Sequence, residues 1–170
     1  HLLFINLITD CFPALALGME PVEAGIMKQK PRNPKDSVFA HGLAASMVFY
    51  GVLVGIITLA AFLIGEYVFL NEAAANTMAF ATLCLSRLFH GFNCKAERAL
   101  LLSREFWNNR ALLLAFAVGA LLLFAALLVP VLQPLMQVAV LPGKLLGAVV
   151  GLPLASLLLI QLLKVVLNRK

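Results

Sequence analysis

Residues 111–129 read ALLLAFAVGALLLFAALLV and contain no polar side chain. About 20 predominantly apolar residues are needed for a helix to cross the hydrocarbon core of a bilayer. Two further stretches are nearly as apolar. Residues 39–64 contain no Asp, Glu, Lys or Arg, and residues 145–163 carry only Ser156 and Gln161 as polar side chains. The sequence therefore predicts an all-α membrane protein.

The composition of the whole chain agrees with this class. Hydrophobic residues make up 62% of the 170 residues and charged residues only 12%, with a mean hydropathy of +0.99. Soluble domains contain about 25% charged residues. We expect residues 1–170 to form a single transmembrane domain, a bundle of five transmembrane helices. The expected spans are residues 1–19, 39–64, 75–94, 111–129 and 145–165.

The positive charges predict the orientation in the membrane. Eleven of the 13 Lys and Arg residues lie in the loop 20–38, in the loop 95–110 or at the C-terminus. The exceptions are Lys144 and Arg87. Because cytoplasmic loops are enriched in Lys and Arg, we expect both loops and the C-terminus to be cytoplasmic. The net charge of +5 thus reports topology, and we expect membrane lipid rather than nucleic acid as a partner.

Motifs for enzymatic chemistry are missing from the sequence. It contains no glycine-rich phosphate loop, no nucleophile elbow and no HExxH motif. Cys11, Cys84 and Cys94 form no CxxC pair, and we interpret them as small apolar packing residues. We therefore expect no catalytic residue and no bound cofactor. The chain opens at His1 without a helix cap or signal peptide, which suggests a piece of a longer protein.

The first expected span, HLLFINLITDCFPALALGM (residues 1–19), is apolar except for Asn6, Thr9 and Asp10. These three residues are three and four positions apart, so they project near one face of a helix. A charged side chain inside a bilayer costs about 2.5–3.5 kcal/mol even on the most lenient scale. Asp10 should therefore face the interior of the bundle and have a partner there.

Pro13 follows three residues after Asp10 and lacks the N–H that would bond the Thr9 carbonyl. We expect the helix to be interrupted near Pro13, which frees a backbone carbonyl beside the three side chains. Carboxylate, amide, hydroxyl and carbonyl oxygens are the ligands of Ca²⁺ rather than of soft metals. A second interpretation is that Asn6 and Thr9 bond neighbouring helices while Asp10 pairs with a cation such as Arg87. The residues alone leave both open.

The stretch NLITDCFPALALGMEP (residues 6–21) resembles the sixth membrane helix of P-type calcium-transporting ATPases of the sarcoplasmic/endoplasmic-reticulum type. The stretch IMKQKPRNPKD (residues 26–36) is similar to the cytoplasmic loop that follows this helix in the family. The remainder resembles the family in its layout of helices and loops. The resemblance implies that the chain is the last five helices of a ten-helix Ca²⁺ pump, and we expect a bacterial plasma membrane as its location.

In the family, the residues that match Asn6 and Asp10 coordinate the transported ion, and the residue that matches Thr9 serves a second ion site. The resemblance implies that the remaining ligands come from the pump's own N-terminal helices. ATP and Mg²⁺ would bind only in the pump's cytoplasmic domains. The chain lacks the DKTG and TGE motifs of those domains, so it cannot hydrolyse ATP by itself.

Arg87 departs from the family pattern, because reticulum-type members place a Glu ligand of the second Ca²⁺ site at the matching position. Arg87 lies eight residues before Lys95, which is about 12 Å along a helix. Arg87 could snorkel toward the headgroups. Alternatively, it could turn into the bundle and pair with Asp10, and this second arrangement predicts one ion per cycle. His90, one turn later, is open to interpretation as a proton relay or as a hydrogen-bonded structural residue.

Two other classes of function compete with the pump. A passive channel or secondary transporter predicts an inverted repeat or a second broken helix, and we find neither in the sequence. A non-catalytic membrane anchor or assembly module predicts no aligned oxygen ligands, whereas Asn6, Thr9 and Asp10 are aligned.

Overall fold

The computed structural model describes residues 1–22, 27, 43–68, 70–96 and 103–167. Its helical segments are α1 (Leu2–Phe4), η1 (Ile5–Cys11), α2 (Phe12–Gly18), α3 (Leu43–Leu63), η3 (Ile64–Val68), α4 (Glu72–Asn93), η4 (Arg104–Trp107), α5 (Arg110–Leu128), α6 (Leu132–Leu135) and α7 (Gly143–Leu167). Within these described ranges there is no β-strand, which confirms the all-α class. Most of the loop 20–38 and part of the loop 95–110 lie outside the described residues.

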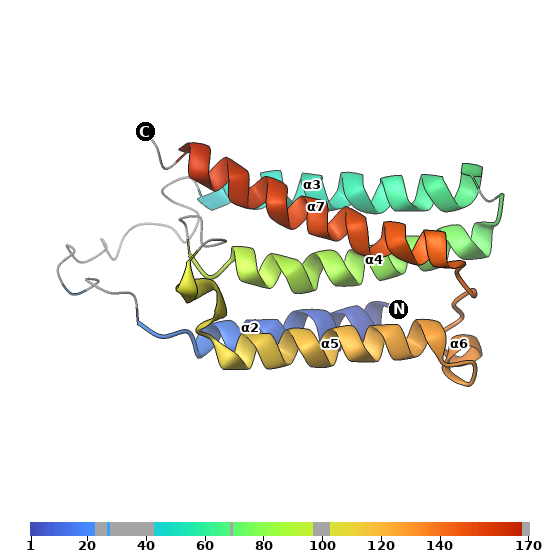
Figure 1. Ribbon diagram of the computed structural model, residues 1–170, viewed down its shortest axis with the longest axis horizontal. Helices are drawn as coiled ribbons and strands as arrows, with labels where there is room; N and C mark the ends of the chain where they lie inside the picture. The colour runs from blue at the N-terminus through green and yellow to red at the C-terminus, as the bar shows by residue number, and fades with distance from the viewer. Residues whose placement is uncertain (23–26, 28–42, 69, 97–102, 168–170) are drawn as a thin grey trace.

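The long helices lie side by side along the long axis of the molecule (Figure 1). The first helix packs against α5, α3 packs against α7, and α4 runs between these two pairs and contacts all of them. The turn from α3 to α4 lies at the same end of the bundle as α6. The segment η4 and the C-terminus lie at the other end (Figure 1).

The central helix α4 is the most polar of the long helices, and it is the one that the others enclose. It carries Thr77, Thr82 and Ser86 in buried positions, whereas α3 directs Val52, Ile56 and other apolar side chains outward. This distribution suits a helix bundle in lipid, where the polar groups face the interior.

Three helical stretches of the described chain are long and apolar enough to cross a membrane. They are Leu43–Val68, Arg110–Leu128 and Gly143–Val166. The first helix, Leu2–Gly18, is apolar but shorter, and α4 falls outside the set because of its polar residues. The structure thus confirms a helical bundle with three such spans, and the count of five spans stays a prediction.

The first helix is not interrupted near Pro13, so that expectation is wrong. Ile5, Cys11 and Phe12 all keep right-handed helical dihedrals, and the helix runs from Leu2 to Gly18. The segment η1 instead adopts the wider π register directly before Pro13. A π register pairs each N–H with a carbonyl one residue further back. The helix can therefore accommodate the missing proline N–H by changing its register rather than by breaking.

The turn between α3 and α4 is fixed by local sequence. The Asn71 side chain caps α4 by accepting a hydrogen bond from the Ala74 amide at 3.1 Å. Gly65 lies so close to α4 that a Cβ on it would be 2.4 Å from Ala75 Cα. Only glycine permits this close approach of the two backbones.

Candidate cation site

The polar centre of the bundle contains an ion pair between the first helix and α4. Arg87 Nη1 donates a hydrogen bond to Asp10 Oδ2. The side chains of Arg87 and Asp10 are 40% and 38% exposed, and among the described residues each is the other's only hydrogen-bond partner. Of the two interpretations of Arg87, this geometry favours the pairing with Asp10 over snorkelling to the headgroups.

The three oxygen-bearing side chains of the first helix lie in different surroundings. Thr9 is buried, and its hydroxyl donates to the Ile5 carbonyl at 2.8 Å. Asp10 is half-buried and Asn6 is exposed. Of the three residues, Thr9 is thus the most enclosed and Asn6 the least. In the π register of η1, residues three positions apart, such as Asn6 and Thr9, diverge more than in an α-helix, because each turn contains more residues.

Pro13 positions the ion pair by packing the first helix closely against α4. Pro13 is buried, and a Cβ on Gly91 would lie 3.5 Å from the Pro13 Cβ. Asp10 lies three residues before Pro13, and Arg87 lies four residues before Gly91. This contact thus holds the two helices together about one turn away from the ion pair.

Asp10 offers a single carboxylate for a cation. No group of three or more His, Cys, Asp or Glu side chains in the described ranges is placed to hold a metal ion. A cation such as Ca²⁺ takes six to eight oxygen ligands. The described chain can therefore supply only part of a coordination shell, and the half-exposed side of Asp10 is open to further ligands.

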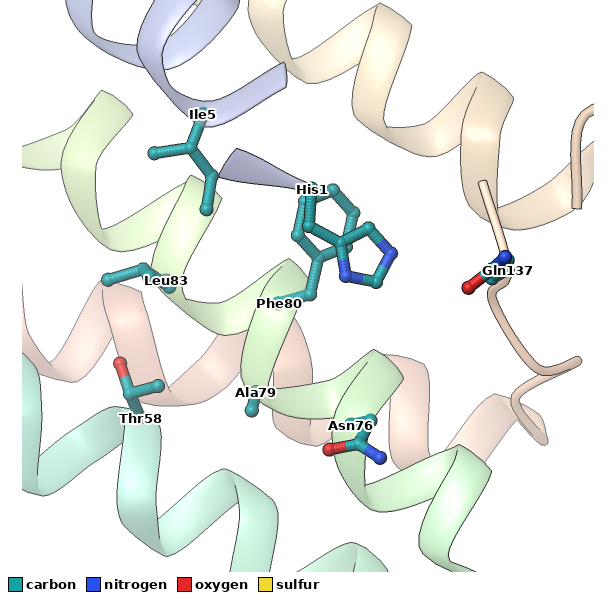
Figure 2. Close-up of a pocket in the computed structure, with 8 residues that line it drawn as sticks. All are labelled: His1, Ile5, Thr58, Asn76, Ala79, Phe80, Leu83 and Gln137. Carbon is teal, nitrogen blue, oxygen red and sulfur yellow. The ribbon is translucent and has the colours of Figure 1, made fainter. Parts of the chain in front are cut away.

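A cavity of about 410 Å³ adjoins this centre, between the first helix, α3 and α4 (Figure 2). Ile5 and Leu83 line it, about one turn from Asp10 and Arg87 respectively. Figure 2 also shows the His1 ring lying against Phe80, with ring centroids 4.2 Å apart. Its lining residues are mostly apolar, with Thr58, Asn76 and Gln137 as the side chains that carry oxygen.

A second ion pair joins the ends of the same two helices and was not predicted from the sequence. Lys95 Nζ lies 3.4 Å from Glu20 Oε1 and donates to Asn108 Oδ1 at 2.8 Å. Asn109 Nδ2 donates to Glu20 Oε2 at 2.6 Å and to the Ala16 carbonyl at 2.9 Å. The sequence does contain a pattern that could have indicated this pair. An acidic residue, Glu20, follows Asp10 and a basic residue, Lys95, follows Arg87 at a similar distance along the chain.

Comparison with known proteins places the chain in a family. The model of a family described as "Cation transporting ATPase, C-terminus" matches residues 1–166.

Named relatives agree with the family match. The chain is 42% identical over 145 residues to a calcium-transporting ATPase of Bacillus subtilis, covering 84% of the chain and 16% of the relative. It is 32% identical to calcium-transporting ATPase 1 of Bacillus cereus, over 96% of the chain and 20% of the relative. A calcium-transporting ATPase of Listeria monocytogenes is 33% identical, over 99% of the chain and 19% of the relative. The chain thus spans about a fifth of the length of these proteins.

Proposed function

The chain belongs to the cation-transporting P-type ATPases, as a C-terminal membrane region of the bacterial calcium-ATPase type, and on this premise we propose that it forms the ion-translocating part of an ATP-driven Ca²⁺ pump. The observation that carries the proposal is the position of Asp10. It lies inside the bundle, half-exposed, with a cation as its only hydrogen-bond partner among the described residues. A carboxylate held in this way can exchange that partner for a transported ion.

Asp10 is the ligand to which we assign the largest contribution, with Asn6 as a further oxygen ligand. The other described carboxylates, Glu20, Glu66, Glu72 and Glu105, lie at or beyond the ends of the long helices. The remaining ligands would come from the pump's own N-terminal helices, as the family resemblance implies. ATP and Mg²⁺ would act in the cytoplasmic domains.

Arg87 would limit the pump to one ion per cycle. Its guanidinium occupies the space beside Asp10 and would repel a second cation placed there. It also compensates the Asp10 carboxylate when no ion is bound, and an uncompensated charge at this depth is costly. The Thr9 hydroxyl, which the resemblance assigns to a second ion, is directed to the Ile5 carbonyl.

We propose that all five long helices cross the membrane, although α4 and the first helix are less apolar or shorter than the other three. Both pack against spanning helices, which can enclose their polar residues. The η4 end of the bundle would face the cytoplasm, because Lys95, Arg104, Arg110 and Lys164 lie there. We infer a bacterial plasma membrane from the bacterial relatives.

The experiment that tests this function is the measurement of bound radioactive Ca²⁺ per phosphorylation site in the complete protein. One Ca²⁺ at saturation, required for phosphorylation by ATP, would support the proposal. A stoichiometry of two would overturn the role of Arg87 and leave the pump assignment intact. Phosphorylation that is independent of Ca²⁺ would overturn the assignment of the ion.

A further inference from the structure

The helix α4 carries three polar atoms that are buried and have no partner. They are Thr82 Oγ1, Ser86 Oγ and His90 Nδ1, and each lacks a hydrogen bond within the described part of the chain. The three residues are four positions apart, so their side chains follow one another along one side of the helix. Buried polar atoms in native proteins are nearly always paired with protein or with ordered water. Three consecutive exceptions therefore require an explanation.

The hydroxyl groups have an alternative partner that they do not use. Three other threonines in the described helices, Thr9, Thr58 and Thr77, donate to the carbonyl four residues back, each at 2.8 Å. This bond is the usual arrangement for a hydroxyl inside a helix. Thr82 and Ser86 are as buried as Thr9 and Thr77 but make no such bond. Their oxygen atoms remain available for another partner.

A cavity lies at the end of this row of polar atoms. It has a volume of about 270 Å³ between α3 and α7, and Ser46, Tyr50 and Lys164 are among its lining residues. The Tyr50 ring packs edge-on against the His90 ring, with centroids 5.1 Å apart. The cavity has room for several water molecules and offers them polar partners. It therefore adjoins the row of buried polar atoms at His90.

We propose that water molecules enter at this cavity, pass Tyr50 and His90, and pair with Ser86 and Thr82 in the interior of the bundle. This hydrated track is distinct from the cation site. Ser86 precedes Arg87 directly, and consecutive residues of a helix point about 100° apart. The track thus runs on the side of α4 that faces Tyr50 of α3, while Arg87 faces Asp10 of the first helix. The proposal of a hydrated track does not depend on which ion the protein carries.

Cysteine modification of the complete protein tests the track. The variant Ser86→Cys is treated with a small water-soluble methanethiosulfonate reagent, and each thiol is quantified by peptide mass spectrometry. Cys84 is the matched control, because it is buried on the same helix but two residues away, on the other side. Since modification follows the access of water and reagent to the thiol, we expect Ser86→Cys to react about tenfold or more faster than Cys84. Equal rates would overturn the proposal.

Blocking the cavity tests the entrance. In the Ser86→Cys background, Ser46→Phe should fill the cavity and slow the modification of the new thiol. Ala44→Phe adds the same ring at an exposed position outside the lining, so it should leave the rate unchanged. An unchanged rate in Ser46→Phe would overturn this entrance.

A measurement on the unsubstituted protein guards against variants that fail to fold. Hydroxyl radicals generated by radiolysis of water label side chains that lie beside water molecules. We expect oxidation of His90 and protection of Phe92, which is 4% exposed on the same helix. Protection of both residues would overturn the track.

Discussion

The Asp10–Arg87 pair and the Glu20–Lys95 pair join the same two parts of the chain, but their surroundings differ. The Asp10 and Arg87 side chains are each more than a third exposed and have no other hydrogen-bond partner among the described residues. The Lys95 side chain is 1% exposed and also donates to the Glu105 carbonyl at 2.6 Å. A pair without other partners can exchange one of its members, whereas a pair whose ammonium is buried and bonded to several oxygen atoms fixes the position of a helix. The first pair therefore suits ion binding and the second suits architecture.

The largest effect is expected when the carboxylate of each pair, Asp10 or Glu20, is replaced by its amide, because only the first replacement should affect ion binding. Asp10→Asn in the complete pump should abolish Ca²⁺-dependent phosphorylation by ATP, because the amide cannot supply the charge that a divalent cation requires. Glu20→Gln is the matched control and should retain the Ca²⁺ dependence. Normal Ca²⁺ dependence in Asp10→Asn would contradict the assignment of the site.

Replacing the two basic residues should affect stability in the opposite order: the substitution in the second pair, at Lys95, should cost more than the substitution in the first pair, at Arg87. Lys95→Met removes a buried ammonium from four oxygen partners, which belong to Glu20, Asn108 and the Glu105 and Phe106 carbonyls. It should lower the free energy of unfolding by about 2 kcal/mol. Arg87→Met removes a half-exposed pair and should lower it by about 0–1 kcal/mol. Thermal inactivation in detergent measures both variants. Equal losses would remove the distinction between the pairs.

Asn109 should contribute to stability through the second pair. Its side chain accepts from the Leu112 amide at 2.9 Å, as the cap of α5, and donates to Glu20. Asn109→Ala should therefore cost about 1–2 kcal/mol, measured as a lower midpoint of thermal inactivation. Asn109→Asp keeps the cap but places a second carboxylate beside Glu20, so a variant as stable as the parent would argue against the bond to Glu20.

The smallest effect is expected for the apparent Ca²⁺ affinity when Arg87 of the first pair is replaced. Under the proposed function Arg87 would compete with the transported cation for Asp10, and a half-exposed pair contributes about 0.5–1 kcal/mol. Arg87→Leu should therefore raise the apparent Ca²⁺ affinity by about twofold to fivefold, read from the Ca²⁺ dependence of phosphorylation. Arg87→Lys retains the charge and is the control. A lower affinity in Arg87→Leu would mean that Arg87 assists binding rather than competes with it.

Features that depend on local order follow directly from the amino-acid sequence. The apolar blocks specify the helices around α4, because their length and composition match the bilayer core. In the structure Asn71 and Asn109 cap α4 and α5, which is also a local feature because a cap depends only on the residues that follow it, but it was not among the predictions from the sequence. The family was also recognisable from residues 6–21 and 26–36, because these motifs are contiguous in the sequence and can be identified without a structure.

Contacts between side chains of different helices depend instead on how the helices pack. Asp10 and Arg87 are 77 positions apart, and their pairing depends on the rotation and axial position of two helices. Thr9 is buried whereas Asn6 is exposed, and hydropathy does not encode that difference. Lys95 is a loop residue in the sequence but is buried by Glu20 and the segment before α5. Such contacts form only when helices distant in the chain pack together, so no local pattern determines them.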